Sequence, residues 1–290
     1  MSDGLHIEVS GRGPAIVMLH GWALHGGVFA PLVQQLSDRY TLYRVDLPGH
    51  GLSRDNDTPL LLEACVAQIA ARTPSAVWLG WSLGGLFALH AAATRPDRVQ
   101  GLVMVCATPR FVHAPDWPHA VDGSVFAQFA HDLQQEHRGT LERFLTLDTL
   151  GSEHAREELR WLRQELYARG EPTASALQAG LQLLQSTDLR SVLPMLTCPS
   201  LWISGRRDRL VPVAGIDNAV QMAGNATHLS IARGAHAPLI GHADGVAQAV
   251  CDFVESLNCH PREGGDPATR AIGSRLEAQR KVTGSPPSRG

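Results

Sequence analysis

Residues 76–94, which read AVWLGWSLGGLFALHAAAT, decide the fold. The apolar run Ala76–Gly80 predicts a buried strand, and the Leu- and Ala-rich run from Leu83 to Thr94 predicts a buried helix. Between them, Gly80-Trp81-Ser82-Leu83-Gly84 matches the pattern Gly-x-Ser-x-Gly. A sharp strand-to-helix turn needs small residues around a serine that it lifts to the carboxyl edge of a sheet. The stretch predicts an α/β protein with Ser82 as nucleophile; a purely structural glycine turn is the alternative.

Short β-rich runs alternate with helix-like stretches on both sides of this turn. They predict a mostly parallel central sheet with helices on both faces. Residues 111–190 predict consecutive helices, inserted as a cap over one end of a core made of residues 1–110 and 191–257. Residues 258–290 are rich in Pro, Gly, Ser and Arg, which predicts a disordered tail. The other expected strands are Ala15–Leu19, Thr41–Asp46, Val99–Ala107, Ser200–Ser204 and Thr227–Ala232.

Composition bounds the class of protein. The chain has 290 residues, of which 44% are apolar and 18% are charged, an ordinary balance for a globular core. The net charge is −3, but residues 258–290 carry six basic and three acidic side chains, so residues 1–257 stand at −6. Such an acidic body argues against general nucleic-acid binding. With no signal-like start, no long apolar run and five cysteines, we expect a cytoplasmic protein without membrane contact.

A nucleophilic serine needs a base, and the base needs a group to orient it. In a fold of this kind the expected chain order is Ser, then Asp or Glu, then His. Asp208 follows the predicted strand Ser200–Ser204, and His236 follows the predicted strand Thr227–Ala232. Both residues would therefore lie at the same sheet edge as Ser82.

Two other carboxylates compete for the acidic role. Asp46 ends a predicted strand but precedes Ser82, which is the wrong order, and a turn-forming or capping role suits it better. Asp188 lies inside the helical block and is the weaker rival.

The segment His20-Gly21-Trp22 follows the predicted strand Ala15–Leu19. We expect the backbone N–H groups of Trp22 and Leu83 to face the developing oxyanion. The Trp22 ring either walls an acyl pocket or is a core side chain. Phosphate-loop and dinucleotide patterns are absent, and the His20/His25 and His236/His242 pairs lack companion carboxylates in the sequence. We therefore expect no cofactor and no metal.

Together these motifs resemble the α/β-hydrolase superfamily over residues 5–257. In detail they resemble its esterases that cleave the methyl ester of pimeloyl-[acyl-carrier protein] in biotin synthesis. The resemblance rests on HGWAL (20–24), DLPGHGLS (46–53), WLGWSLGG (78–85), ERFL (142–145), TDLR (187–190), LVP (210–212) and HAP (236–238). It departs from the family pattern at Arg209 and Leu239, which would reshape the pocket mouth.

The resemblance implies roles for individual residues. Ser82, Asp208 and His236 would be the catalytic triad, and Trp22 and Leu83 would contact the oxyanion and the substrate. An acyl channel under the cap would be lined by Phe144, Leu145, Thr146, Leu147 and Asp148.

The resemblance also implies an acidic acyl-carrier protein as partner of a serine carboxylesterase. Arginines on the cap would contact it; the alternative is a solvated helix face, because Glu153, Glu157 and Glu158 are interleaved. Other functions that share this fold are a promiscuous short-chain carboxylesterase, a C–C bond hydrolase, or a ligand-binding receptor. A monomer is the default expectation. The candidate carrier contacts are Arg138, Arg143, Arg156 and Arg160.

Overall fold

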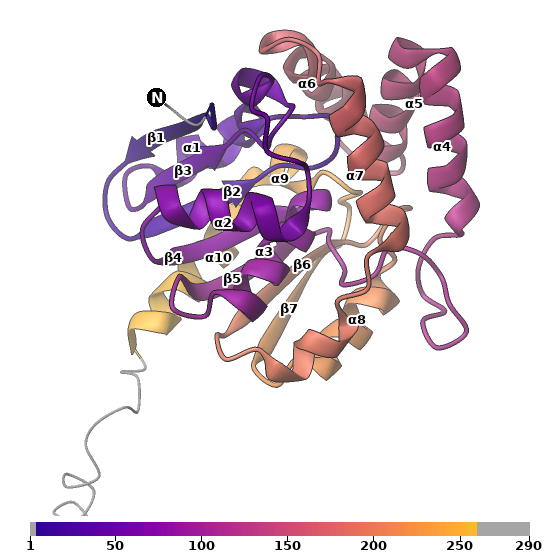
Figure 1. The fold of residues 1–290 in the computed structure, drawn as a ribbon. Coiled ribbons are helices and arrows are strands. Elements are labelled where there is room, and N and C mark those ends of the chain that lie inside the picture. Colours follow the sequence, from indigo (N-terminus) through magenta and orange to yellow (C-terminus); the bar gives the residue numbers. More distant parts are fainter. Residues whose placement is uncertain (1–3, 260–290) are drawn as a thin grey trace, which may run out of the picture.

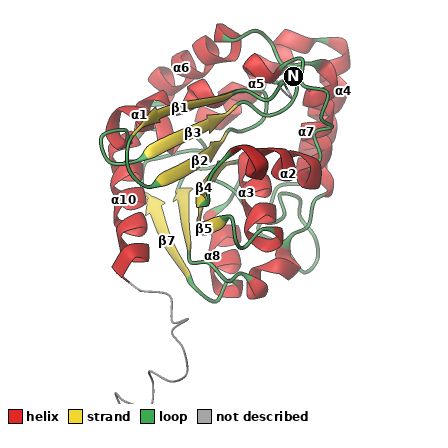
Figure 2. Ribbon diagram, turned by 60° about the vertical axis from the view of Figure 1, so that its left-hand side comes forward, coloured by secondary structure: helices red, strands yellow, loops and turns green. Residues whose placement is uncertain are grey.

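The computed structural model describes residues 4–259, and the predicted tail 258–290 lies almost entirely outside them. Seven strands form one sheet in the order β1-β3-β2-β4-β5-β6-β7. β1 pairs antiparallel with β3, and every other neighbouring pair is parallel. Figures 1 and 2 show the twisted sheet running through the molecule. The strands are β1 (Ile7–Gly11), β2 (Ala15–Leu19), β3 (Thr41–Val45), β4 (Ala76–Trp81), β5 (Val99–Val105), β6 (Ser200–Gly205) and β7 (Ala226–Ile231).

Helices cover both faces of this sheet. On one face α1 contacts α10, and on the other α2 contacts α3 (Figure 2). The helices that connect the strands are α1 (Ala30–Leu36), α2 (Leu62–Arg72), α3 (Leu83–Thr94) and α8 (Val213–Met222). Two more helices, α9 (Pro238–Gly241) and α10 (Ala243–Cys259), follow the last strand. None of the helices in residues 4–259 is long and apolar enough to span a bilayer.

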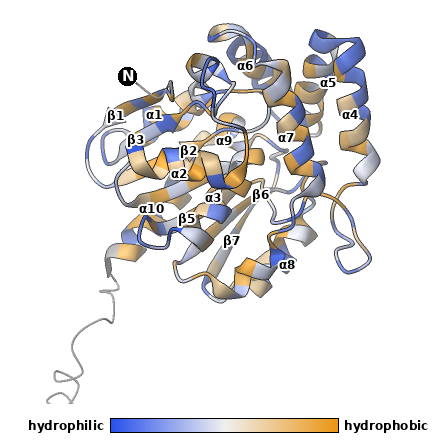
Figure 3. Ribbon diagram, viewed as in Figure 1, coloured by the Kyte–Doolittle hydropathy of each residue, from blue (hydrophilic) through white to orange (hydrophobic). Residues whose placement is uncertain are grey.

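Four further helices lie together at one side of the sheet (Figure 1). We call these four helices, residues 123–186, the helical cap. The cap helices mix hydrophilic and hydrophobic residues along their length, whereas α3 is mainly hydrophobic (Figure 3). The cap helices are α4 (Gly123–Gln135), α5 (His137–Thr149), α6 (Ala155–Ala168) and α7 (Ala174–Ser186).

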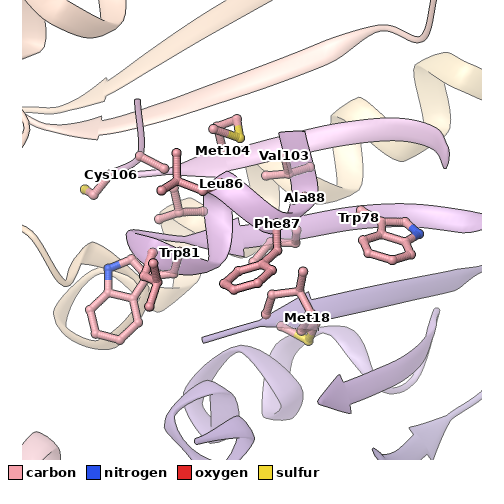
Figure 4. Close-up of a cluster of buried hydrophobic side chains, with 14 of the residues drawn as sticks. Met18, Trp78, Trp81, Leu86, Phe87, Ala88, Val103, Met104 and Cys106 are labelled. Atoms are coloured by element: carbon pink, nitrogen blue, oxygen red, sulfur yellow. The ribbon is translucent and has the colours of Figure 1, made fainter. Parts of the chain in front are cut away.

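The predicted helix from Leu83 to Thr94 is α3, with the predicted bounds. It is buried on nearly all sides, which explains its apolar composition all the way round. Figure 4 shows Leu86, Phe87 and Ala88 of this helix among Trp78 and Met104 of the neighbouring strands. This packing anchors the helix whose first residue follows Ser82.

Two expectations about secondary structure were wrong. All six predicted strands form, but β1 was missed because it is a short edge strand with exposed residues such as Val9, and it lacks the apolar run of the inner strands. Residues 111–122 are not helical: they contain only isolated bridges between Val112 and Val121 and between Ala114 and Trp117. Pro115 and Pro118 lie in this segment, and proline lacks the N–H group that a helix interior requires.

Candidate active site

Ser82 occupies the sharp turn between β4 and α3. Its backbone has φ +54° and ψ −121°, a conformation that a non-glycine residue adopts only under strain. Gly80 and Gly84 make the turn possible, because a Cβ atom at Gly84 would lie 2.1 Å from the Leu19 carbonyl oxygen and one at Gly80 would lie 2.4 Å from that of Gly84. Both glycines of the motif therefore have a steric cause.

The structure brings Ser82, His236 and Asp208 together from the loops after β4, β7 and β6. His236 Nε2 lies 2.8 Å from Ser82 Oγ, and His236 Nδ1 lies 2.8 Å from Asp208 Oδ2. The other oxygen of Asp208 accepts hydrogen bonds from the backbone amides of Leu210 at 2.8 Å and Val211 at 2.9 Å. Because the carboxylate can only accept, Nδ1 carries the proton and Nε2 is free to accept the Ser82 proton.

The surroundings hold His236 in place and set its basicity. Its amide donates to the Asp148 carbonyl at 3.0 Å, and its own carbonyl accepts from Trp81 Nε1 at 2.7 Å. Burial lowers the pKa of His236, but the charge and hydrogen bond of Asp208, aided by the charge of Asp148, more than reverse this, so that its pKa is raised. This arrangement can remove a proton from Ser82 and return it to a leaving group.

The loop after β2 lies against the serine. A Cβ atom at Gly21 would lie 3.3 Å from Ser82 Cβ, so glycine permits the close approach. The Leu83 amide is the first of α3 and has no acceptor within the helix, and no carbonyl in residues 4–259 accepts a backbone hydrogen bond from Leu83 or Trp22. Both expected oxyanion donors are thus free of backbone partners near Ser82.

Sequence reasoning missed the role of His20 in this loop. Its Nδ1 lies 2.8 Å from the Gly21 carbonyl oxygen, and its Nε2 accepts from the Leu47 amide at 3.0 Å. Burial lowers the pKa of His20 well below its ordinary value, which leaves the ring neutral and able to do both. The ring thereby ties the Gly21 loop to the segment after β3, and a histidine directly before that glycine was the only sequence signal.

The Trp22 ring is buried and contacts the cap. Its Nε1 donates to the Leu177 carbonyl of α7 at 2.8 Å, and its ring packs edge-on against Phe144 of α5 with centroids 4.6 Å apart. Gly180 of α7 allows the contact, since a Cβ atom there would lie 2.6 Å from Trp22 Cδ1. The ring therefore joins the sheet loop to two cap helices.

The five residues expected to line an acyl channel do not share one face of α5. Phe144, Leu145 and Asp148 are buried and Leu147 is partly buried. Thr146 is exposed, and its hydroxyl donates to the Glu142 carbonyl at 2.8 Å, so its place in the channel stays a prediction. These side chains point in different directions because a helix turns about 100° per residue.

Asp148 is unusual among these residues. Its side chain is fully buried, and neither carboxylate oxygen has a hydrogen-bond partner within residues 4–259. Burial, with the charges of Asp208 and Glu158, raises its pKa to about 7, although His236 acts in the opposite direction. A carboxyl group that is half protonated near neutral pH thus lies beside the triad histidine.

The rival carboxylates have structural partners elsewhere. Asp46 accepts from the Gly26 amide at 2.7 Å and the Leu52 amide at 2.8 Å, and it pairs with Arg169 of the cap at 3.2 Å. This is the turn-forming role expected of it. Asp188 pairs with Arg110 and Arg190, whose hydrogen bonds, those of Arg190 above all, hold its pKa below the usual range.

The four cap arginines differ in their partners. Arg138 pairs with Glu171, and Arg143 pairs with Asp132 and Glu136. Arg156 and Arg160 are exposed on α6, and no ion pair within residues 4–259 includes them. Of the two residues that depart from the family pattern, Arg209 is exposed and Leu239 is buried.

The sequence matches known proteins over most of its length. Residues 14–243 match the family model described as alpha/beta hydrolase fold. A "Pimeloyl-[acyl-carrier protein] methyl ester esterase" of Xanthomonas oryzae pv. oryzae is 63% identical over 253 residues, which are 87% of this chain and 100% of the relative. A protein of the same name from Stenotrophomonas maltophilia is 62% identical over 261 residues, 90% of this chain and 100% of the relative.

Solved structures show the same fold at low identity. An esterase from Exiguobacterium antarcticum superposes with a TM-score of 0.78 at 20% identity, covering 87% of this chain and 95% of its own. The enol-lactonase from Burkholderia xenovorans gives a TM-score of 0.74 at 22% identity, covering 87% of this chain and 96% of its own.

Proposed function

Because this chain belongs to the alpha/beta hydrolase fold family and, within it, to the pimeloyl-[acyl-carrier protein] methyl ester esterases, we propose that it is a serine carboxylesterase that hydrolyses the methyl ester of pimeloyl-acyl-carrier protein. Its place would be biotin biosynthesis. The observation that carries the proposal is identity of 63% over the whole length of such a relative, together with a hydrogen-bonded Ser82–His236–Asp208 chain.

In the proposed mechanism Ser82 Oγ attacks the ester carbonyl carbon while His236 Nε2 takes its proton. The backbone amides of Trp22 and Leu83 donate to the oxyanion, and Asp208 stabilises the imidazolium. The tetrahedral intermediate collapses, and His236 returns the proton to the methoxy oxygen, so that methanol leaves. Water then attacks the acyl-enzyme with His236 as base, which releases the free carboxylate and restores Ser82.

The substrate can reach Ser82 only if the helical cap moves. Ser82 is 3% exposed and His236 is 1% exposed, so a carrier-borne ester cannot reach them past the side chains as they lie. We infer that the helical cap shifts to admit the acyl chain. The Trp22–Leu177 hydrogen bond and the Trp22–Phe144 contact are the links nearest the serine that such a shift would alter.

The test of the function is methanol release from pimeloyl-acyl-carrier protein methyl ester by the wild-type chain and by Ser82→Ala. Loss of a triad nucleophile lowers kcat by a factor on the order of 10⁶. Brisk release that depends on Ser82 supports the proposal. Cleavage of a free short-chain ester without release from the carrier-linked ester would replace it with the short-chain carboxylesterase alternative.

We propose that Arg156 and Arg160 contact the carrier protein. Four residues apart on α6, they share one helix face, and both are exposed. Two of the three interleaved acids are engaged elsewhere: Glu158 is buried, and Glu153 pairs with Arg233 at 2.9 Å. This leaves a positive face that can steer an acidic partner. Arg138 and Arg143 would have to exchange their present ion-pair partners to join it.

The matched test replaces Arg156 and Arg160 with alanine and compares Arg12→Ala. Arg12 is exposed in the turn between β1 and β2, at the sheet edge opposite Ser82. The double variant should raise KM for the carrier-linked ester at low salt and leave hydrolysis of a free short ester unchanged. An equal effect on both esters, or an equal effect of Arg12→Ala, would refute the docking role.

A further inference from the structure

A second cluster of ionisable side chains lies outside the triad, where the cap meets the end of the sheet domain. Glu153 and His154 immediately precede α6, and His242 lies between α9 and α10. Glu153 Oε1 is 3.7 Å from His154 Nε2 and 3.9 Å from His242 Nδ1. The two imidazole rings meet edge-on, with centroids 5.0 Å apart. One ligand atom from each of the three residues lies within 4.8 Å of both others.

We propose that Glu153, His154 and His242 bind a divalent transition metal ion, with Zn²⁺ as the best match. Two imidazole nitrogens and one carboxylate oxygen are a standard donor set for this ion, whose bonds to them are about 2.0–2.2 Å long. Ligand atoms at the corners of such a tetrahedron are about 3.4 Å apart. The observed separations of 3.7 and 3.9 Å are therefore a few tenths of an ångström wider than a bound ion would require.

The neighbouring groups support these roles. Glu153 uses its other oxygen, Oε2, to accept from Arg233 at 2.9 Å, which leaves Oε1 facing the two rings. Hydrogen-bonded outer partners of this kind orient metal ligands.

Charges around the cluster also matter for a cation. Arg233 is the nearby positive group, but its side chain is 69% exposed, so water screens its charge. Glu158 of α6 is fully buried, its Oε1 accepts from the Ser152 hydroxyl at 2.7 Å, and its Oε2 has no hydrogen-bond partner within residues 4–259. An ion beside His154 would give this carboxylate an opposite charge.

The position gives the site a consequence. Two ligands belong to the segment that leads into cap helix α6, and the third lies six residues after His236. A bound ion would therefore tie the cap to the segment that follows the triad histidine. We expect it to raise the thermal stability of the protein and to slow turnover of the carrier-linked ester, which needs the cap to shift. This last effect rests on the proposed function; binding and stabilisation do not.

The test uses full-length protein without an affinity tag and Zn²⁺ alone as probe. Calorimetry should find one ion per chain at micromolar or tighter Kd, and a hundredfold excess over Kd should raise Tm by roughly 5 °C. His242→Ala, His154→Ala and Glu153→Gln should each weaken binding at least tenfold. His131→Ala, which removes an exposed histidine of α4, is the matched control and should leave Kd unchanged.

Wild-type Kd values in the three ligand variants would overturn the site, as would no binding at 100-fold the protein concentration. Glu153 and His154 are exposed and His242 is partly buried, so circular dichroism checks that each variant folds. Binding and a Tm shift without slower ester turnover would refute only the coupling to the cap. Failure of ester turnover in metal-free protein would instead refute the proposed function and leave the metal site standing.

Discussion

Replacing Asp148 with asparagine should remove a loss of stability that the wild-type chain suffers as pH rises. The carboxyl group is fully buried without a hydrogen-bond partner in residues 4–259, and its pKa is raised from 3.8 to about 7. An acid with a higher pKa in the folded state favours folding in its protonated form. Below pH 3.8 both folded and unfolded chains hold the proton, and the group has no cost. The cost grows as pH rises toward 7 and is constant above it.

The magnitude follows from the two pKa values. The difference between 3.8 and about 7 corresponds to roughly 4 kcal/mol of destabilisation above pH 7. Part of this cost is already present at pH 5, so roughly 3 kcal/mol should develop between pH 5 and pH 8. Asparagine has the same shape and no charge, but its buried amide costs about 1–3 kcal/mol at every pH. The change in the stability difference with pH therefore reports on the carboxyl group alone, because the cost of the asparagine amide is the same at every pH.

The assay is urea unfolding of both proteins at pH 5, 6, 7 and 8. The free energy of unfolding of Asp148→Asn relative to the wild type should rise by roughly 3 kcal/mol over this range. Glu158, whose pKa burial raises to about 7, adds a pH dependence of the same sign to both proteins, and the part of it that does not depend on the charge of Asp148 cancels in the difference. Asp38→Asn, at an exposed position, is the control and should run parallel to the wild type. Parallel curves for Asp148→Asn would show that the carboxylate is stabilised in the folded state, and would refute the reasoning.

The remaining predictions concern the triad and the links between cap and sheet. The acid limb of the kcat/KM profile should have its midpoint above pH 6.5, because Asp208 raises the pKa of His236 against the effect of burial, and a midpoint below 6.5 would contradict this. Trp22→Phe should cost about 1 kcal/mol of unfolding free energy through the lost bond to Leu177; unchanged stability would deny that the bond contributes. Gly180→Ala should lower Tm, because the alanine Cβ would lie 2.6 Å from Trp22 Cδ1. An unaltered melting curve would mean that α7 shifts away from the Trp22 ring at no cost in stability. Arg169→Met should lower the free energy of unfolding by about 3 kcal/mol, because it leaves the buried Asp46 carboxylate without its cation, and urea unfolding would measure this. A loss under 1 kcal/mol would mean that the backbone amides around Asp46, and not Arg169, stabilise its charge.

Local patterns predicted the sheet well where strands are buried. Ala15–Leu19 and the turn at Ser82 have strong apolar or glycine patterns, because an inner parallel strand packs on both faces and the turn excludes side chains. The edge strand Ile7–Gly11 has one neighbouring strand and exposed residues, so its sequence is mixed and it was missed. Residues 111–122 lie between β5 and α4, and they do not form the expected helix because Pro115 and Pro118 cannot donate helical hydrogen bonds.

For the candidate site, the sequence alone determined which residues meet at the sheet edge. Chain order and the position of Ser82, Asp208 and His236 after three parallel strands suffice, because the carboxyl ends of parallel strands share one edge. Pattern could not show that Thr146 faces solvent while Asp148 is buried, since helix rotation about its own axis is decided by what the helix packs against.

Only the tertiary structure decided the contacts between residues far apart in the chain. The Trp22–Leu177 bond joins residues 155 positions apart, and the cluster of Glu153, His154 and His242 brings the start of α6 beside the residue between α9 and α10. No periodicity or spacing encodes such pairs, because they depend on how the cap packs onto the sheet. The physical reason is that side-chain burial, and with it the raised pKa of Asp148, is a property of the packed chain and not of any segment.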